Sequence, residues 1–290
     1  MGIRDPGVLT STAKMAEISR ASDYALGSTD AEHERLIRQS ARIAPLTERF
    51  FREAGIGPGY RVLDLGSGVG DVAILAARLV GPSGEVVGIE RDPRTITRAR
   101  ARTLESGLSN VTFTQSDVCD ITTATPFDAV VGRYILMYLP DPSAVLRALT
   151  QLLRPGGVVA FLDVSWAPAI ALAAGLPLWS ACTSLIVELF RRSGVNPEMG
   201  LALRQVFPEA GLPVPKMHME VLLAGDAEFA RSLHDLLVSL RPKFEQCQLN
   251  LKQLGDFDTL AMRLHAELAE SNRVASWLAI VSAWSRKLAS

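Results

Sequence analysis

The sequence predicts an α/β fold in which helices cover both faces of a parallel sheet. Short apolar runs near residues 61–65, 85–89, 111–115, 128–132 and 157–163 alternate with segments of helical spacing. A glycine turn follows the first run, and an acidic residue stands at or just after the end of each of the next two. A chain of 290 residues can bury a large core, and we expect one structural domain with insertions.

The flanking segments predict helical additions to this sheet. Residues 17–53 place apolar side chains at helical spacing with a break at 24–30, so we assign 1–55 to an N-terminal helical lid. The sheet core is assigned to 56–165 and a helical cap insertion to 166–215. Residues 216–290 then supply the last two strands, near 217–223 and 276–284, with a helical insertion at 226–272.

The glycine turn predicts a nucleoside site with a cationic ligand. Gly66, Gly68 and Gly70 permit positive φ and let the backbone approach a ligand closely. The dinucleotide motif G-x-G-x-x-G needs a third glycine where this chain has Asp71. Carboxylates at Asp64 and Asp71 would repel a pyrophosphate and attract an ammonium or sulfonium, which argues against NAD.

These segments together resemble the class I S-adenosylmethionine (SAM) dependent methyltransferases. The resemblance is to their small-molecule branch, the ubiquinone/menaquinone C-methyltransferases and natural-product methyltransferases, and it covers roughly residues 60–165. It implies a Rossmann-like, seven-stranded sheet that is mostly parallel. Its last strand is antiparallel and lies between the fifth and sixth. It also implies SAM as the cofactor.

The resemblance assigns roles to residues at the strand ends. Glu90 would hold both ribose hydroxyls, Asp117 would accept from the adenine amino group, and the backbone N–H of Val118 would reach the ring. Arg133 would pair with the cofactor carboxylate or a substrate anion, although a solvated or capping arginine is an open alternative. The expected cofactor-binding set is Asp64, Gly66, Ser67, Gly68, Gly70, Glu90, Arg91, Asp117, Val118, Arg133 and Gln39.

Three residues are candidates for a catalytic role. Tyr24 lies in a lid segment that closes over the methionine moiety in similar enzymes, and Tyr138 stands where the family's fourth-motif loop borders the acceptor. Core packing is the alternative for both tyrosines. His234, on an insertion helix, is the candidate general base, with a surface role as its alternative. Glu188 is a further acidic residue that could enter the expected substrate chamber above the carboxyl edge of the sheet.

The composition indicates which binding partners and which cellular location to expect. The net charge is −1 and no basic cluster occurs, which argues against nucleic acid. Cys119, Cys182 and Cys247 are odd in number and far apart, so we expect a reducing, cytoplasmic location and no metal site. Residues 164–187 carry no charge, but Pro168, Gly175 and Pro177 interrupt them, which favours an apolar cap over a membrane span.

The sequence therefore predicts methyl transfer to O, N or C of an apolar acceptor. The uncharged cap, with Trp166 and Trp179, points to an aromatic molecule such as an indole, or to an isoprenoid-like secondary metabolite. Two alternatives stay open: a nicotinamide-dependent dehydrogenase, and a binding module that keeps the fold without turnover. The helical stretch 226–272 could also bury against itself in a homodimer.

Overall fold

A single seven-stranded sheet organises the chain. The computed structural model describes residues 29–117, 120–121 and 123–288, so Tyr24, Val118 and Cys119 lie outside the described part. The strands run in the order β3-β2-β1-β4-β5-β7-β6. Their bounds are β1 Arg61–Leu65, β2 Glu85–Glu90, β3 Val111–Gln115, β4 Phe127–Arg133, β5 Leu153–Ser165, β6 Lys216–Ala224 and β7 Ala275–Arg286.

The predicted sheet is confirmed in its topology. β1 to β5 pair in parallel, and β7 pairs antiparallel with both β5 and β6. The last strand in the chain thus lies between the fifth and sixth strands, as the resemblance implied. Because β1 to β5 all run the same way, their carboxyl ends meet at one edge, which is where such sheets bind ligands.

Helices begin where short polar side chains can cap them. Thr29 accepts from the Glu32 N–H at the start of α2, and Asp92, Asp141 and Asp226 cap α4, α5 and α9 in the same way. The helices are α2 Asp30–Glu53, α3 Asp71–Val80, α4 Pro93–Glu105, α5 Pro142–Gln151, α6 Ala167–Leu172, α7 Pro177–Arg192, α8 Met199–Glu209, α9 Ala227–Gln246 and α10 Leu260–Glu270, with 3₁₀ turns η1 Leu136–Tyr138 and η2 Lys252–Leu254.

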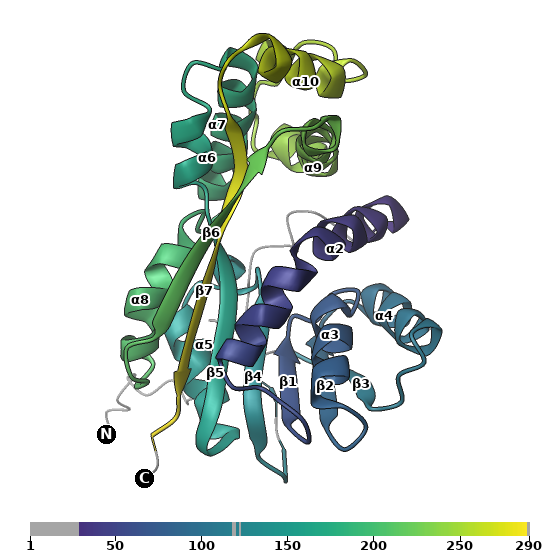
Figure 1. Ribbon diagram of the computed structural model, residues 1–290, viewed down its shortest axis with the longest axis vertical. Helices are drawn as coiled ribbons and strands as arrows, with labels where there is room; N and C mark the ends of the chain where they lie inside the picture. The colour runs from purple at the N-terminus through teal and green to yellow at the C-terminus, as the bar shows by residue number, and fades with distance from the viewer. Residues whose placement is uncertain (1–28, 118–119, 122, 289–290) are drawn as a thin grey trace, which may run out of the picture.

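The helices form two layers and a cap. α2, α3 and α4 lie on one side of the sheet, and α5 and α8 on the other (Figure 1). β6 and β7 continue past the sheet edge, and α6, α7, α9 and α10 gather around their far ends (Figure 1). α9 packs on α10 and α7, so its apolar face is covered within the chain. Homodimerisation through this stretch stays a prediction.

The uncharged segment 164–187 is divided between different elements. It contains the end of β5, all of α6 and the first part of α7, with Pro168 and Pro177 in the first turns of the two helices. In the part of the chain that the structure describes, no helix has the length and apolarity needed to span a membrane.

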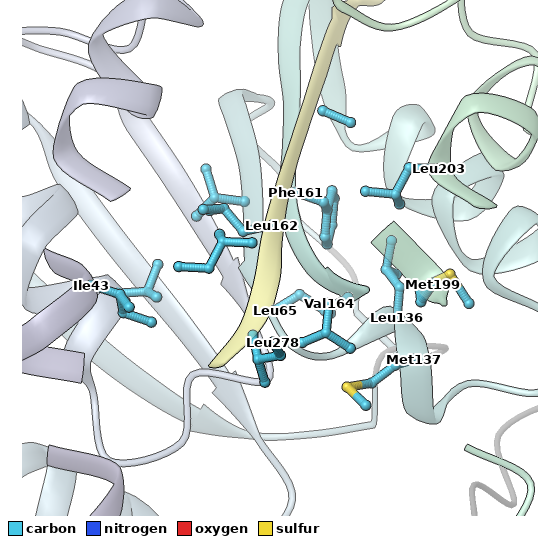
Figure 2. Close-up of a cluster of buried hydrophobic side chains, with 14 of the residues drawn as sticks. Ile43, Leu65, Leu136, Met137, Phe161, Leu162, Val164, Met199, Leu203 and Leu278 are labelled. Atoms are coloured by element: carbon cyan, nitrogen blue, oxygen red, sulfur yellow. The ribbon is translucent and has the colours of Figure 1, made fainter. Parts of the chain in front are cut away.

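The sheet packs closely against α8. Leu136, Met137, Val164, Met199 and Leu203 belong to one buried apolar cluster where η1 and β5 meet this helix (Figure 2). Gly200 of α8 permits the contact, because a Cβ added there would lie 2.6 Å from Val281 Cβ and 2.9 Å from the carbonyl oxygen of Val164. The backbone of the helix therefore approaches the sheet at a distance that only glycine allows.

We predict that Gly200→Ala destabilises the protein. Helix propensity alone would stabilise the variant by about 1 kcal/mol, but overpacking against Val281 costs about 1–3 kcal/mol, so the net free energy of unfolding should fall. Urea denaturation measures it. Leu201→Ala, at a side chain that is 46% exposed, is the control and should change stability by less than about 0.5 kcal/mol. A stabilised Gly200→Ala variant would contradict the close packing.

Candidate functional site

One cavity of about 420 Å³ lies at the carboxyl edge of the sheet. Its volume is in the range of small-molecule sites. The turns after five parallel strands contribute to its wall: Gly66–Val69 after β1, Ile89–Asp92 at the end of β2, Ser116 and Asp117 after β3, Arg133–Ile135 after β4, and Val164 and Trp166 around the end of β5. α2 and the cap complete the wall.

The three motif glycines have two different roles. Gly66, Gly68 and Gly70 all have positive φ, at 64°, 52° and 85°. A Cβ on Gly68 would meet nothing within 4 Å, so its missing side chain leaves open space in the cavity wall. A Cβ on Gly70 would lie 3.1 Å from Phe113 Cζ and 3.2 Å from Ala99 Cβ. Gly66, Ser67 and Gly68 line the cavity, whereas Gly70 starts α3 and supports the turn from behind.

Asp64 lies beneath this turn and does not line the cavity. Its side chain is buried, and neither carboxyl oxygen has a hydrogen-bond partner. Burial raises its pKa to about 8, and the positive charge of Arg133 opposes that shift. The carboxyl group is therefore mostly protonated at neutral pH. The Ser67 hydroxyl, which does line the cavity, is also buried without a partner.

Asp71 corrects the electrostatic argument made from the sequence. Its carboxylate lines the cavity but pairs with Arg102 at 2.7 Å. The Arg102 guanidinium also donates to the carbonyl oxygen of Val69 at 2.6 Å. Since Asp64 is buried below the turn and Asp71 is neutralised, these two acids do not form an exposed anionic pair. What still disfavours a dinucleotide is the turn itself, which has Asp71 where the motif G-x-G-x-x-G needs its third glycine.

Glu90 is held in a fixed position at the end of β2. One carboxylate oxygen accepts from the Gly68 N–H at 3.0 Å, and the other from the N–H groups of Arg91 and Asp92 at 2.7 and 3.1 Å. These bonds tie β2 to the glycine turn and leave the carboxylate further acceptor capacity. Arg91 and Asp117 also line the cavity, with 3.9 Å between a guanidinium nitrogen and a carboxylate oxygen.

α2 closes the cavity with Gln39, which was predicted from the sequence, and with His33 and Ser40, which were not. Arg133 of β4 donates to Ser40 Oγ at 2.8 Å and to Thr47 Oγ1 at 3.2 Å, which joins the lid helix to the sheet. Gln39 lines the cavity and accepts from Arg35 at 2.7 Å. His33, which is buried and lines the cavity, lies 3.3 Å from Thr95 Oγ1.

The opposite end of the cavity is apolar and aromatic. Its wall contains Met137, Tyr138, Leu139, Val145, Val164, Trp166, Phe190, Leu236, Trp277 and Leu278. The Trp166 ring lies between Phe190 and Trp277, with centroids 6.0 and 6.1 Å away. Trp179 does not line the cavity, because it is buried in the cap, where its Nε1 donates to the carbonyl oxygen of Leu264 at 3.0 Å. Only the first of the two tryptophans singled out from the sequence faces the site.

Buried Asp163 supports this end from below. It accepts from the N–H groups of Met137 and Val164 at 3.2 and 3.0 Å, so it fixes the η1 turn that carries Tyr138. Burial raises its pKa to about 7, and hydrogen bonds from backbone N–H groups oppose the shift. The sequence analysis treated this residue only as a strand boundary.

The structure brings one of the three candidate catalytic residues to the cavity. Tyr138 lines it, while Tyr24 lies outside the described residues. His234 does not line the cavity, and its Nδ1 lies 3.2 Å from Asp235 on the same helix. Glu188 also lies away from it, paired with Arg192 at 2.7 Å. Among the described residues, no cluster of three His, Cys, Asp or Glu side chains is arranged to hold a metal ion.

Comparisons with known proteins agree with this geometry. Residues 56–189 match a family model described as a methyltransferase domain. The chain is 41% identical over 110 residues to the 2-phytyl-1,4-naphtoquinone methyltransferase of Synechococcus elongatus, which covers 37% of this chain and 47% of that protein. It is 36% identical over 112 residues to the arsenite methyltransferase of Halobacterium salinarum, covering 38% of this chain and 29% of that protein.

The matched region is a part of each protein. The chain spans less than half the length of these two relatives. A wider likeness extends to solved structures. The [4+2]-cyclase SpnF superposes with a TM-score of 0.52 at 19% identity, over 85% of this chain and 81% of that chain. This likeness shows a shared fold.

We predict that Asp64→Asn flattens the pH dependence of stability. The folded-state pKa of Asp64 is about 8, above the ordinary value of 3.8, so protonation favours the folded state and stability is lost as pH rises toward 8. Between pH 5 and pH 7 this residue should contribute a loss of about 1 kcal/mol per pH unit, which the variant lacks. Urea titrations at each pH measure the difference. Parallel curves for the two proteins would contradict the buried, unpartnered carboxyl.

Proposed function

We propose that this chain, whose residues 56–189 are a SAM-dependent methyltransferase domain, transfers the methyl group of that cofactor to an apolar small molecule. One observation carries the proposal. A single cavity joins a polar end, made by the turns that follow β1, β2 and β3, to an uncharged aromatic end made by η1, β5, β7 and the cap. A nucleoside-containing cofactor and an apolar acceptor would meet inside it.

The polar end suits the adenosyl part of the cofactor. Glu90 is anchored by three backbone N–H groups and presents its carboxylate to the cavity, which supports the role of binding the ribose hydroxyls. Asp117 stands at the next strand end, suited to the adenine amino group. The space above Gly68 and the unpartnered Ser67 hydroxyl fit a polar ligand that lies against the turn.

The protein's contribution to methyl transfer is mainly binding and alignment. The sulfonium of SAM supplies an electrophilic methyl group. The chain's own residues then hold the acceptor in line with that group and exclude water. α2, tied to the sheet through Arg133, and the aromatic wall close the cavity on two sides. Tyr138 is the candidate side chain for proton transfer to or from the acceptor. Tyr24 lies outside the described residues and His234 does not line the cavity, so both stay proposals.

The acceptor that fits best is aromatic or isoprenoid-like. The end of the cavity away from the glycine turn offers aromatic and aliphatic side chains, which bind planar apolar molecules by burial and stacking. The naphthoquinone named for one relative belongs to this chemical class. Whether O, N or C receives the methyl group stays open. A role in natural-product biosynthesis and a cytoplasmic location stay predictions.

Two other functions are alternatives to methyl transfer. A nicotinamide-dependent dehydrogenase needs a pyrophosphate site, and Asp71 stands where the dinucleotide turn needs its third glycine. A binding module without turnover is the stronger alternative, since a shared fold does not by itself imply methyl transfer. Transfer of a labelled methyl group from SAM to any naphthol, indole or isoprenoid hydroquinone would exclude it.

We predict that Glu90→Gln weakens binding of S-adenosylhomocysteine about tenfold to a hundredfold, the range for losing a hydrogen bond to a charged group. Isothermal titration calorimetry measures the affinity, and NADH in the same assay should give no binding heat. Glu85→Gln is the matched control, because Glu85 begins the same strand and pairs with Arg61 outside the cavity. Equal affinities for both variants would refute the assignment of the cofactor end.

A further inference from the structure

The indole N–H of Trp166 is a buried donor without a partner. Trp166 is 1% exposed and lines the apolar end of the cavity, yet its Nε1 makes no hydrogen bond. The indole nitrogen can only donate, and a buried donor left unpaired is costly. Trp179 shows the ordinary solution in the same cap, with its Nε1 donating to the carbonyl oxygen of Leu264.

The ring of Trp166 is held in place from several sides. Its backbone N–H donates to Glu198 Oε1 at 3.0 Å, and the preceding Ser165 hydroxyl donates to the other carboxylate oxygen of Glu198. The ring packs edge-on against Phe190 and at a tilt against Trp277. Both of these rings also line the cavity. Because packing holds the indole ring in place, its N–H offers one hydrogen bond in a set direction, and such a donor can orient a ligand.

The surroundings indicate which ligand group the donor would suit. The rings that contact Trp166, those of Phe190 and Trp277, carry no charge. The arginines that line the cavity already have partners: Arg35 pairs with Glu32, Arg91 with Asp117, and Arg133 donates to Ser40 and Thr47. A carboxylate or phosphate at the Trp166 ring would therefore be buried among apolar rings. A carbonyl, ether or phenol oxygen needs one donor and no counter-charge.

We propose that Trp166 is a specificity-determining residue whose indole N–H donates to a neutral oxygen on an aromatic acceptor. The inference rests on the proposed function and narrows its acceptor class to oxygenated aromatic molecules. It assigns Val164 and Leu278, which both line the cavity and lie near each other (Figure 2), to apolar contact with the remainder of the acceptor.

Two probes of nearly equal shape test this hydrogen bond. 2-Acetylnaphthalene carries a carbonyl oxygen that can only accept, and 2-ethylnaphthalene carries none. Calorimetric titration of each into the full chain, with and without S-adenosylhomocysteine, gives the ratio of their affinities. In Trp166→Phe the preference for the acetyl compound should fall about threefold to tenfold relative to the parent, as expected for the loss of one hydrogen bond. Trp179→Phe is the matched control and should keep the parent ratio.

Infrared spectroscopy provides a test that does not depend on a variant folding correctly. The carbonyl stretch of ¹³C-labelled 2-acetylnaphthalene should move to lower wavenumber in the parent complex than in hexane. An unshifted carbonyl band, an unchanged ratio in Trp166→Phe, or failure of both probes to bind would overturn the inference. The titration with S-adenosylhomocysteine separates failure of this inference from failure of the proposed function. Loss of S-adenosylhomocysteine binding would contradict the proposed function, whereas the ratio of the two probe affinities would still test the Trp166 hydrogen bond.

Discussion

The shared direction of β1 to β5 is the constraint on which the rest of the structure depends. Parallel pairing from β3 to β5 sends the turn that follows each strand to the same edge. Residues far apart in the chain therefore meet there. In the glycine turn, the Ser67 N–H donates to the carbonyl oxygen of Ile89 and the Gly68 N–H donates to the Glu90 carboxylate. Both bonds are possible only because β1 and β2 end side by side. The Glu90 carboxylate at this edge is therefore positioned by backbone N–H groups.

The two ends of the cavity arise from different parts of the sheet. The polar end is made by β1, β2 and β3, on one side of the sheet, whose turns offer backbone amides and carboxylates. The apolar end depends on β5 and β7, and it lies toward the cap to which β6 and β7 continue beyond the sheet edge (Figure 1). α2 connects the two, since Arg133 bonds to two of its hydroxyls. A methyl donor and an apolar acceptor can thus be placed next to each other by one rigid framework.

Much of the fold could be predicted from the sequence, because buried parallel strands are nearly continuous apolar runs. The seven strand positions agree with the structure, the largest differences being at the ends of the long β5 and β7. Contacts over long sequence separations could not be predicted. The pairing of Asp71 with Arg102, and the choice between Trp166 and Trp179, depend on which neighbours the fold supplies. One signal was available for the lid: His33, Ser40 and Thr47 repeat every seven residues, in step with Leu36 and Ile43, which marks one face of α2.

The central claim is that the strand edge above buried Asp64 receives a positively charged cofactor. Because the pKa of Asp64 is about 8 without a ligand, a nearby cation should favour the ionised carboxylate and release a proton. Calorimetry of SAM binding at pH 7, in buffers that differ in ionisation enthalpy, measures that proton directly. The account predicts proton release by the parent and less release by Asp64→Asn. Binding heats that do not depend on the buffer, or the same release from both proteins, would contradict it.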